Sequence, residues 1–187
     1  MRRLTHGRSE GNLMKISMHA MSVDVFTHTL GSLSAFLEKG AASARQRKFE
    51  PAVLLASRLA PDMLPLTRQV QIACDLAKNG SARLAGVEAP RFEDNEATID
   101  ELKARVAKTL AYIKSVDGKA IDNGTAREIT FPLGPVNKGH MKGDDYLTHF
   151  VLPNFYFHCT AAYAILRHCG VEIGKQDFLG GIPMKMT

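Results

Sequence analysis

The stretch PNFYFHCTAAYAILRHCGVEIGKQDFLG, residues 153–180, decides the fold class because its first half has the pattern of an amphipathic helix. Asn154 and His158 stand one helical turn apart on this helix, on a face that small and apolar residues continue. Gly170 is expected to end the helix. Two polar side chains therefore point together toward the interior of a helix bundle, and the sequence predicts a polar pocket there.

Three earlier segments carry apolar residues at steps of three and four, the spacing of one helix face. These stripes are Val23, Phe26, Leu30, Leu33 and Leu37; Leu66, Val70, Ala73 and Ala77; and Ile99, Leu102, Val106, Leu110 and Ile113. The second helix is predicted over residues 62–77, with a short helical piece before it from Pro51. The third helix begins at a T-x-x-E capping box of Thr98 and Glu101, and Gly118 is expected to close it.

The pattern changes between residues 122 and 143, where REITFPL is followed by a run rich in glycine and proline. This predicts a short strand or hairpin in a long loop. Pro153 is expected to kink the last helix or to divide it. The fold class is therefore all-α, a four-helix bundle with a hairpin before the last helix. The tail, residues 170–180, is too rich in glycine for a helix and is expected to fold back over the bundle.

Length and composition fit one soluble domain, since the chain has 187 residues, of which 45% are hydrophobic and 23% charged. No window approaches the roughly 18 consecutive apolar residues of a membrane span, so no membrane contact is expected. Cys74, Cys159 and Cys169 are odd in number and lack a CxxC spacing, which favours a reducing cytoplasm.

The net charge of +5 is concentrated at the start of the chain, where residues 1–20 carry three of the five excess positive charges. This stretch has no sustained periodicity. We expect residues 1–20 to be a disordered leader, either a misassigned start or a vector remnant, and residues 21–187 to be a single domain. Because the remaining charge is nearly balanced, no nucleic-acid partner is expected.

His158, with Asn154 one turn before it, is the leading candidate for a metal ligand or an acid–base group. The alternative is a core histidine that a backbone carbonyl, Tyr156 or Tyr163 satisfies. The sequence contains no GxSxG, HExxH, P-loop or GxGxxG pattern, so no catalytic residue is assigned and no nucleotide cofactor is expected.

Asp62 and Gln69 share one stripe of the second predicted helix. If this stripe faces inward, Asp62 and Gln69 meet Asn154 and His158 across the core; otherwise Asp62 is a helix cap that faces solvent. The predicted divalent-metal ligands are thus His158, Asn154 and Asp62, with Gln69, Tyr156 and Tyr163 lining the pocket. One histidine, one aspartate and two amides are a weak ligand set for zinc.

The chain resembles the DinB/YfiT-like superfamily through SVDVFTHTLGSLSAFLEK (22–39) and the pattern FHxxxAYAILRxxGVxxGKxDFLG (157–180). The resemblance implies an up-down-down-up four-helix bundle, frequent dimers, and in many relatives a metal held by one histidine of the second helix and an HxxxH pair of the fourth. Asn154 and His158 stand where that pair is expected. The second helix contains no histidine, and Asp62 or Gln69 is the nearest substitute.

Two functions follow from these observations. The first is a degenerate metal-dependent hydrolase or transferase with a polar pocket between helices. The alternative is a non-catalytic, dimeric ligand-binding or stress-type protein in which the polar residues form a structural network. A homodimer is expected because Phe155, Phe157 and Leu166 give the last helix more apolar surface than one core needs.

Overall fold

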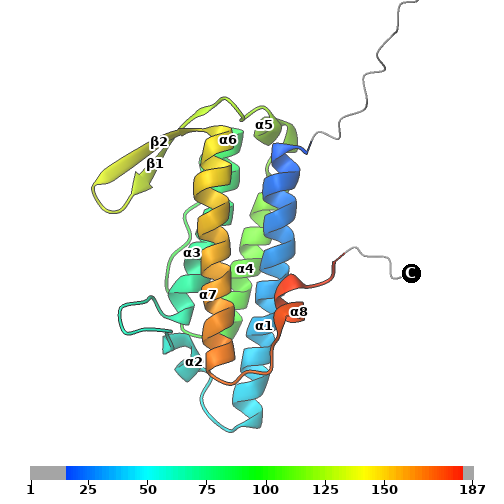
Figure 1. The fold of residues 1–187 in the computed structure, drawn as a ribbon, viewed down its shortest axis with the longest axis vertical. Helices are drawn as coiled ribbons and strands as arrows, with labels where there is room; N and C mark the ends of the chain where they lie inside the picture. The colour runs from blue at the N-terminus through cyan, green and yellow to red at the C-terminus, as the bar shows by residue number, and fades with distance from the viewer. Residues whose placement is uncertain (1–15, 183–187) are drawn as a thin grey trace, which may run out of the picture.

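The computed structural model describes residues 16–182, and the chain is helical from Met18 (Figure 1). Most of the predicted leader therefore lies outside the described residues. In chain order the elements are the π-helical turn Ala20–Asp24, α1 (Val25–Gln46), α2 (Ala52–Ala56), α3 (Leu66–Ala85), α4 (Ile99–Ser115), α5 (Gly118–Asp122), β1 (Glu128–Leu133), β2 (Asn137–Lys142), α6 (Gly143–Asp145), the π-helical segment Tyr146–Val151, α7 (Leu152–His168) and α8 (Lys175–Leu179). The mostly helical fold and the hairpin confirm the coarse prediction.

Four long helices lie side by side, and α1 and α3 each contact both α4 and α7. Figure 1 shows α1 and α7 running downward and α3 and α4 running upward. Hydrogen bonds support these directions. At the start of the first helix, the amide of His19 donates to Asp122 of α5 (2.8 Å); at the end of α3, the carbonyl of Leu84 accepts from Arg127, just after α5 (3.2 Å). The start of α1 and the end of α3 therefore lie at the same end of the helices. Since α3 and α4 run in parallel, residues 86–98 return along the length of these helices as a long crossover.

The predicted apolar stripes form the core. All but one of the stripe residues are buried, each with 7% or less of its surface exposed: Val23, Phe26, Leu30, Leu33, Leu37, Leu66, Val70, Ala73, Ala77, Ile99, Leu102, Val106 and Ile113. Phe26 of α1 meets Phe155 of α7 edge to face, with ring centroids 4.8 Å apart. Burying each such large side chain contributes about 1.5–3 kcal/mol, so packing of the stripes holds the helices together.

The boundaries of α3 differ from the prediction at both ends. The helix begins at Leu66, not Asp62, because Pro65 caps it in an extended conformation. It continues to Ala85, beyond the predicted end at Ala77, and so includes Gly80. A Cβ atom at Gly80 would lie only 2.9 Å from the side chain of Val151, so this glycine permits close packing of α3 against the last helix.

The capping box before α4 is present as predicted. The amide of Glu101 donates to the hydroxyl of Thr98 (3.1 Å), and the Glu101 carboxylate accepts from the Thr98 amide (2.9 Å). The sequence predicted that Gly118 closes this helix, but Gly118 instead begins α5. The extended backbone of Val116 ends α4 instead.

The antiparallel hairpin of β1 and β2 pairs Leu133 with Asn137 and Thr130 with His140. Figure 1 shows it projecting from one end of the helices. Its buried residue Phe131 packs against Tyr146 and Phe150, with centroids 4.9 and 4.4 Å apart. This aromatic cluster attaches the hairpin to the last helix.

Pro153 does not divide the last helix, contrary to one of the two predicted outcomes, because residues 143–168 form a continuous helical run. The wider π-helical turns directly before Pro153 accommodate a residue that has no N–H to donate. The tail folds back over the bundle as predicted, because it packs on α1, but it differs from the prediction in forming the short helix α8. His28 contacts the carbonyl of Leu179 (2.5 Å), and Lys39 pairs with Asp177 (2.5 Å).

No helix within residues 16–182 is long and apolar enough to cross a membrane.

Candidate functional site

The structure brings His158 of α7 and Gln69 of α3 together. Nδ1 of the imidazole lies 2.7 Å from Oε1 of Gln69, and the Gln69 amide nitrogen donates to the carbonyl of Leu64 at 3.0 Å. Because that second bond fixes the orientation of the amide, the oxygen faces the ring and Nδ1–H must donate to it. Gln69 is only 1% exposed, so this bond satisfies a buried polar group.

Burial lowers the pKa of His158 below its usual value of 6.5. The unfolded chain therefore takes up a proton first as the pH falls, and the free energy of unfolding decreases from about pH 6.5 downward. We expect His158→Gln to reduce this loss of stability in urea unfolding between about pH 5 and pH 8. His168→Gln, at an exposed position of the same helix, is the matched control. An unchanged pH dependence in His158→Gln would contradict the expectation.

The other two predicted metal ligands are differently placed. Asn154 donates its side-chain amide to the carbonyl of Phe150 (2.6 Å), within its own helical segment. Asp62 lies exposed in the turn before α3, as in the alternative that places its side chain in solvent. Arg58 holds this turn by donating to the carbonyls of Pro61 (3.4 Å) and Met63 (3.2 Å). Asp62 does not cap α3, because Pro65 shifts the helix start.

The side chains around His158 are a poor ligand set for the metal that the family resemblance implies. In residues 16–182, no group of three or more His, Cys, Asp or Glu side chains is arranged to hold a metal ion. Nδ1 of His158 is bonded to Gln69, and the Asn154 amide donates to Phe150 of the π-helical segment before α7. These residues do not fit the three-ligand metal site that the resemblance implies.

The two tyrosines predicted to line the pocket lie in different surroundings. Tyr163 packs between Phe36 and Phe178, with ring centroids 6.1 and 5.8 Å away. Tyr156 is 41% exposed and lines an open groove of about 340 Å³ on the outer face of α7. The apolar groove consists of Leu59, Met63, Tyr156, Phe157, Thr160, Ala161 and Ala164.

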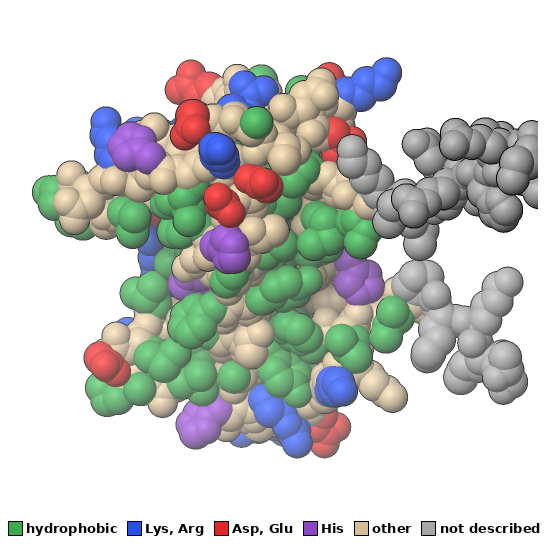
Figure 2. Space-filling view, turned by 45° about the horizontal axis from the view of Figure 1, so that its top comes forward, with side chains coloured by type: hydrophobic (Ala, Val, Ile, Leu, Met, Phe, Trp, Pro, Cys, Tyr) green, Lys and Arg blue, Asp and Glu red, His purple; other side chains and the backbone are tan. Residues whose placement is uncertain are grey.

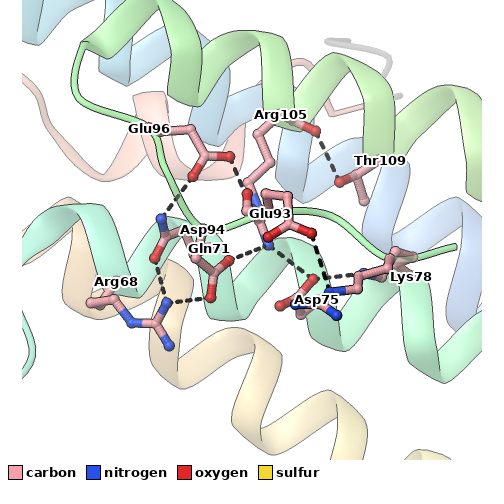
Figure 3. Close-up of polar contacts among 10 residues, drawn as sticks. Arg68, Gln71, Asp75, Lys78, Glu93, Asp94, Glu96, Arg105 and Thr109 are labelled. Atoms are coloured by element: carbon pink, nitrogen blue, oxygen red, sulfur yellow. Dashed lines mark hydrogen bonds and ion pairs between the residues drawn. The ribbon is translucent and has the colours of Figure 1, made fainter. Parts of the chain in front are cut away.

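A second polar cluster was not predicted from sequence (Figure 3). Its centre is Arg105 of α4, which is only 3% exposed. The guanidinium contacts three carboxylates, those of Asp75 (3.0 Å), Asp94 (3.0 Å) and Glu96 (2.9 Å). It also donates to the backbone carbonyl of Glu93 (3.0 Å). Arg105 therefore binds the crossover to α3 and α4 at once.

Further contacts extend the Arg105 cluster along α3. Arg68 donates to Gln71 and to Asp94, both at 2.6 Å, and Gln71 donates to Glu96 at 2.7 Å. Burial opposes ionisation of Asp94, but the hydrogen bond from Arg68 and the charge of Arg105 hold its pKa below the usual value. Lys78 adds an ion pair with Asp75 (2.9 Å). The three cations Arg68, Lys78 and Arg105 thus balance the three carboxylates, which suits attachment of the crossover better than binding of a charged ligand.

An aromatic residue completes the attachment of the crossover. The ring of Phe92 lies between two ammonium groups, 4.3 Å from Lys78 and 4.1 Å from Lys108. The one sequence signal for this cluster was Arg105 itself, three residues after Leu102 and next to Val106 in the apolar stripe of its helix. An arginine at such a position requires buried carboxylates from elsewhere in the chain.

Two of the three cysteines behave as packing residues. Cys74 and Cys159 are fully buried free thiols, and Cys169 is half-buried. Burial raises the pKa of Cys74 to about 12 and that of Cys159 well above its usual value. Neither buried thiol forms a reactive thiolate near neutral pH.

Comparison with known proteins agrees with the fold. A family model described as a domain of unknown function, DUF1993, matches residues 18–179. A DinB family member protein from Shewanella denitrificans, of known crystal structure, is 41% identical with a TM-score of 0.84, covering 91% of this chain and 96% of that one. No curated protein matches this chain. The match to the family model includes all four long helices, and the chain therefore belongs to the DUF1993 family, a DinB-like domain of unknown function.

Proposed function

We propose that this protein is a non-catalytic, dimeric binding protein, built on the up-down-down-up four-helix bundle of its DinB-like relatives. His158 and Gln69 then act as a structural pair that fixes the packing of α3 against α7. The bond of 2.7 Å between them carries this proposal, because it uses the imidazole to satisfy a buried amide. The opposite directions of the two helix pairs, α1 with α7 and α3 with α4, support the bundle topology.

The remaining polar groups support a structural role as well. Gln69 makes one bond with each end of its amide, and Asn154 donates to the carbonyl of Phe150. These bonds hold the two side chains in orientations set by the protein. A metal-dependent hydrolase or transferase would instead need these oxygen and nitrogen atoms to turn toward a common ion. Asp62 would also have to leave its exposed turn.

The binding surface that we assign to this protein is the apolar groove rather than the polar pair. The groove is lined by Tyr156 and Phe157 at one side and by Leu59 and Met63 at the other. It is open along the helix and has few polar atoms to position a small substrate for reaction. Such a surface suits a protein partner better than a reacting molecule.

The first test is thermal unfolding with and without zinc, nickel and manganese, alongside elemental analysis of the purified protein. We expect no stoichiometric metal and no metal-dependent change of Tm in the wild type. His158→Ala is expected to lower the free energy of unfolding by about 1–3 kcal/mol, because the Gln69 oxygen loses its donor in a buried site. His168→Ala, an exposed change in the same helix, should have little effect.

A double-mutant cycle separates the structural pair from a metal centre. Gln69→Leu leaves the imidazole without its acceptor, whereas Gln69→Leu with His158→Leu removes both polar groups together. The double variant is therefore expected to be less destabilised than the two single effects added. Stabilisation of the wild type by one equivalent of metal, lost in His158→Ala, would overturn the proposed function and favour the metal-dependent enzyme.

A further inference from the structure

The outer face of α7 lacks the charges that a solvent-facing helix usually carries. Residues 152–166 contain no Asp, Glu, Lys or Arg. Yet the helix is not enclosed by the rest of the chain, since Tyr156 is 41% and Phe157 56% exposed. Pro153 and Thr160 are exposed on the same side. An uncharged, partly aromatic face of this kind requires a partner to cover it.

The charges beyond this face differ in sign at its two ends. Asp144 and Asp145 stand exposed before it, and Arg167 stands exposed after it, with His168 beside it. Figure 2 shows a band of hydrophobic side chains across one face of the molecule, with mostly acidic side chains directly above it and mostly basic ones below. A helix face with an acidic start, an apolar middle and a basic end is complementary to itself when two copies run antiparallel.

We propose that a second copy of this chain covers the outer face of α7, with the two α7 helices antiparallel across a two-fold axis at Tyr156. Asp145 and Arg167 each stand eleven residues from Tyr156 in the sequence. A two-fold axis at Tyr156 therefore places the acidic start of one helix, Asp144 and Asp145, near Arg167 of the partner subunit, and does so twice. At the α-helical rise of about 1.5 Å per residue, Arg167 lies about 16 Å from the axis along α7.

The same axis accounts for the apolar groove. Leu152 stands four residues before Tyr156, and Thr160 stands four residues after it. Leu152 of the partner subunit therefore lies opposite Thr160, where the small side chains of Ala161 and Ala164 leave room. The half-buried Leu152 and the groove are thus knob and hole of one isologous contact. This inference rests on the dimeric state in the proposed function, and it places the dimer interface on the outer face of α7.

Sedimentation velocity over a concentration series tests the interface in the full chain. The wild type is expected to form a dimer, and Tyr156→Glu to raise the dissociation constant by roughly a hundredfold or more, because it buries two carboxylates at the axis. Ala107→Glu adds the same charge on the exposed side of α4 and is the matched control. Circular dichroism melts of each variant establish that the subunits are folded.

A charge exchange tests the antiparallel register. Asp145→Arg and Arg167→Asp are each expected to raise the dissociation constant roughly tenfold, since each places like charges together at two symmetric positions. The double variant restores opposite charges and is expected to restore the dimer. Failure of the double variant to recover, with both single variants folded and weakened, would overturn the register.

Covalent trapping gives a second readout. A cysteine on the two-fold axis meets its own copy, so Tyr156→Cys is expected to form a cross-linked dimer under mild oxidation. Ala107→Cys and the wild type, with its half-buried Cys169, set the background. A wild type that stays monomeric throughout would overturn the interface and the dimeric state together. A dimer that Tyr156→Glu does not weaken would overturn this face alone, and neither result depends on the metal measurements.

Discussion

Replacement of Arg105 by alanine is expected to lower the free energy of unfolding by about 3–5 kcal/mol, the range for breaking a buried ion pair by removing one partner. The guanidinium is enclosed, with 2% of the side chain exposed, and the carboxylate of Glu96 beside it is 9% exposed. Without Arg105, the Glu96 carboxylate stays partly buried and loses its cation, while Asp75 keeps only its ion pair with Lys78 (2.9 Å). The cost comes mainly from these uncompensated charges rather than from the lost bonds themselves.

The loss should also be local. Arg105 donates to the backbone of Glu93, and together with Arg68 it binds Asp94, so these contacts hold the crossover. We expect faster amide hydrogen exchange across residues 86–98 in Arg105→Ala, while α1 and α7 change only with global stability. Urea unfolding and exchange mass spectrometry measure the two effects separately.

The matched control is Lys108→Ala, which removes a cation above the Phe92 ring at an exposed position of the same helix. An exposed cation–π contact contributes about 0.5–1 kcal/mol, so this change should be small. If Arg105→Ala cost no more than Lys108→Ala and the crossover kept its protection, the Arg105 cluster would not be what attaches the crossover.

The four long helices could be predicted because their signals are local. A stripe such as Phe26, Leu30 and Leu33 repeats with the period of a helix, and the capping box at Thr98 needs only four consecutive residues. Helix ends were less predictable, since Gly80 looks like a loop residue until Val151 is packed against it. Tertiary contact there outweighs the local cost of a glycine in a helix.

The Arg105 cluster could not be assembled from sequence for a related reason. Its carboxylates come from α3 and from an irregular crossover, so no periodic pattern connects them with Arg105. Asp94 and Glu96 look like loop charges in solvent until the crossover folds back between two parallel helices.

The last helix shows a different limit. Two of the three residues expected to form a dimer surface, Phe155 and Leu166, are instead fully buried in the core, and only Phe157 is exposed. Because α7 is apolar around most of its circumference, the sequence pattern does not separate its inner face from its outer one. His158 and Gln69 were predicted to meet only if the stripe of α3 faced inward, and the structure brings these two together without Asp62.

Substitution of Gly143 by alanine is expected to destabilise the protein by about 3 kcal/mol, near the upper end of the cost of overpacking, because the new methyl group would meet backbone. Gly143 is buried where the hairpin enters the last helix. A Cβ atom there would overlap the carbonyl oxygen of Gly124 and lie 2.9 Å from its carbonyl carbon. Gly124 in turn is packed against the carbonyl of Leu84, so it cannot move away without displacing the end of α3.

The matched control for Gly143→Ala is Gly31→Ala in the middle of α1, where a Cβ atom meets nothing within 4 Å. That change should stabilise the protein by about 0.5–1 kcal/mol, since alanine loses less conformational freedom in a helix. Urea unfolding of both variants therefore gives shifts of opposite sign. Equal and small changes in the free energy of unfolding would mean that the backbone at Gly143 relaxes at little cost. The contact between α3, the Gly124 turn and the last helix would then not fix where the last helix begins.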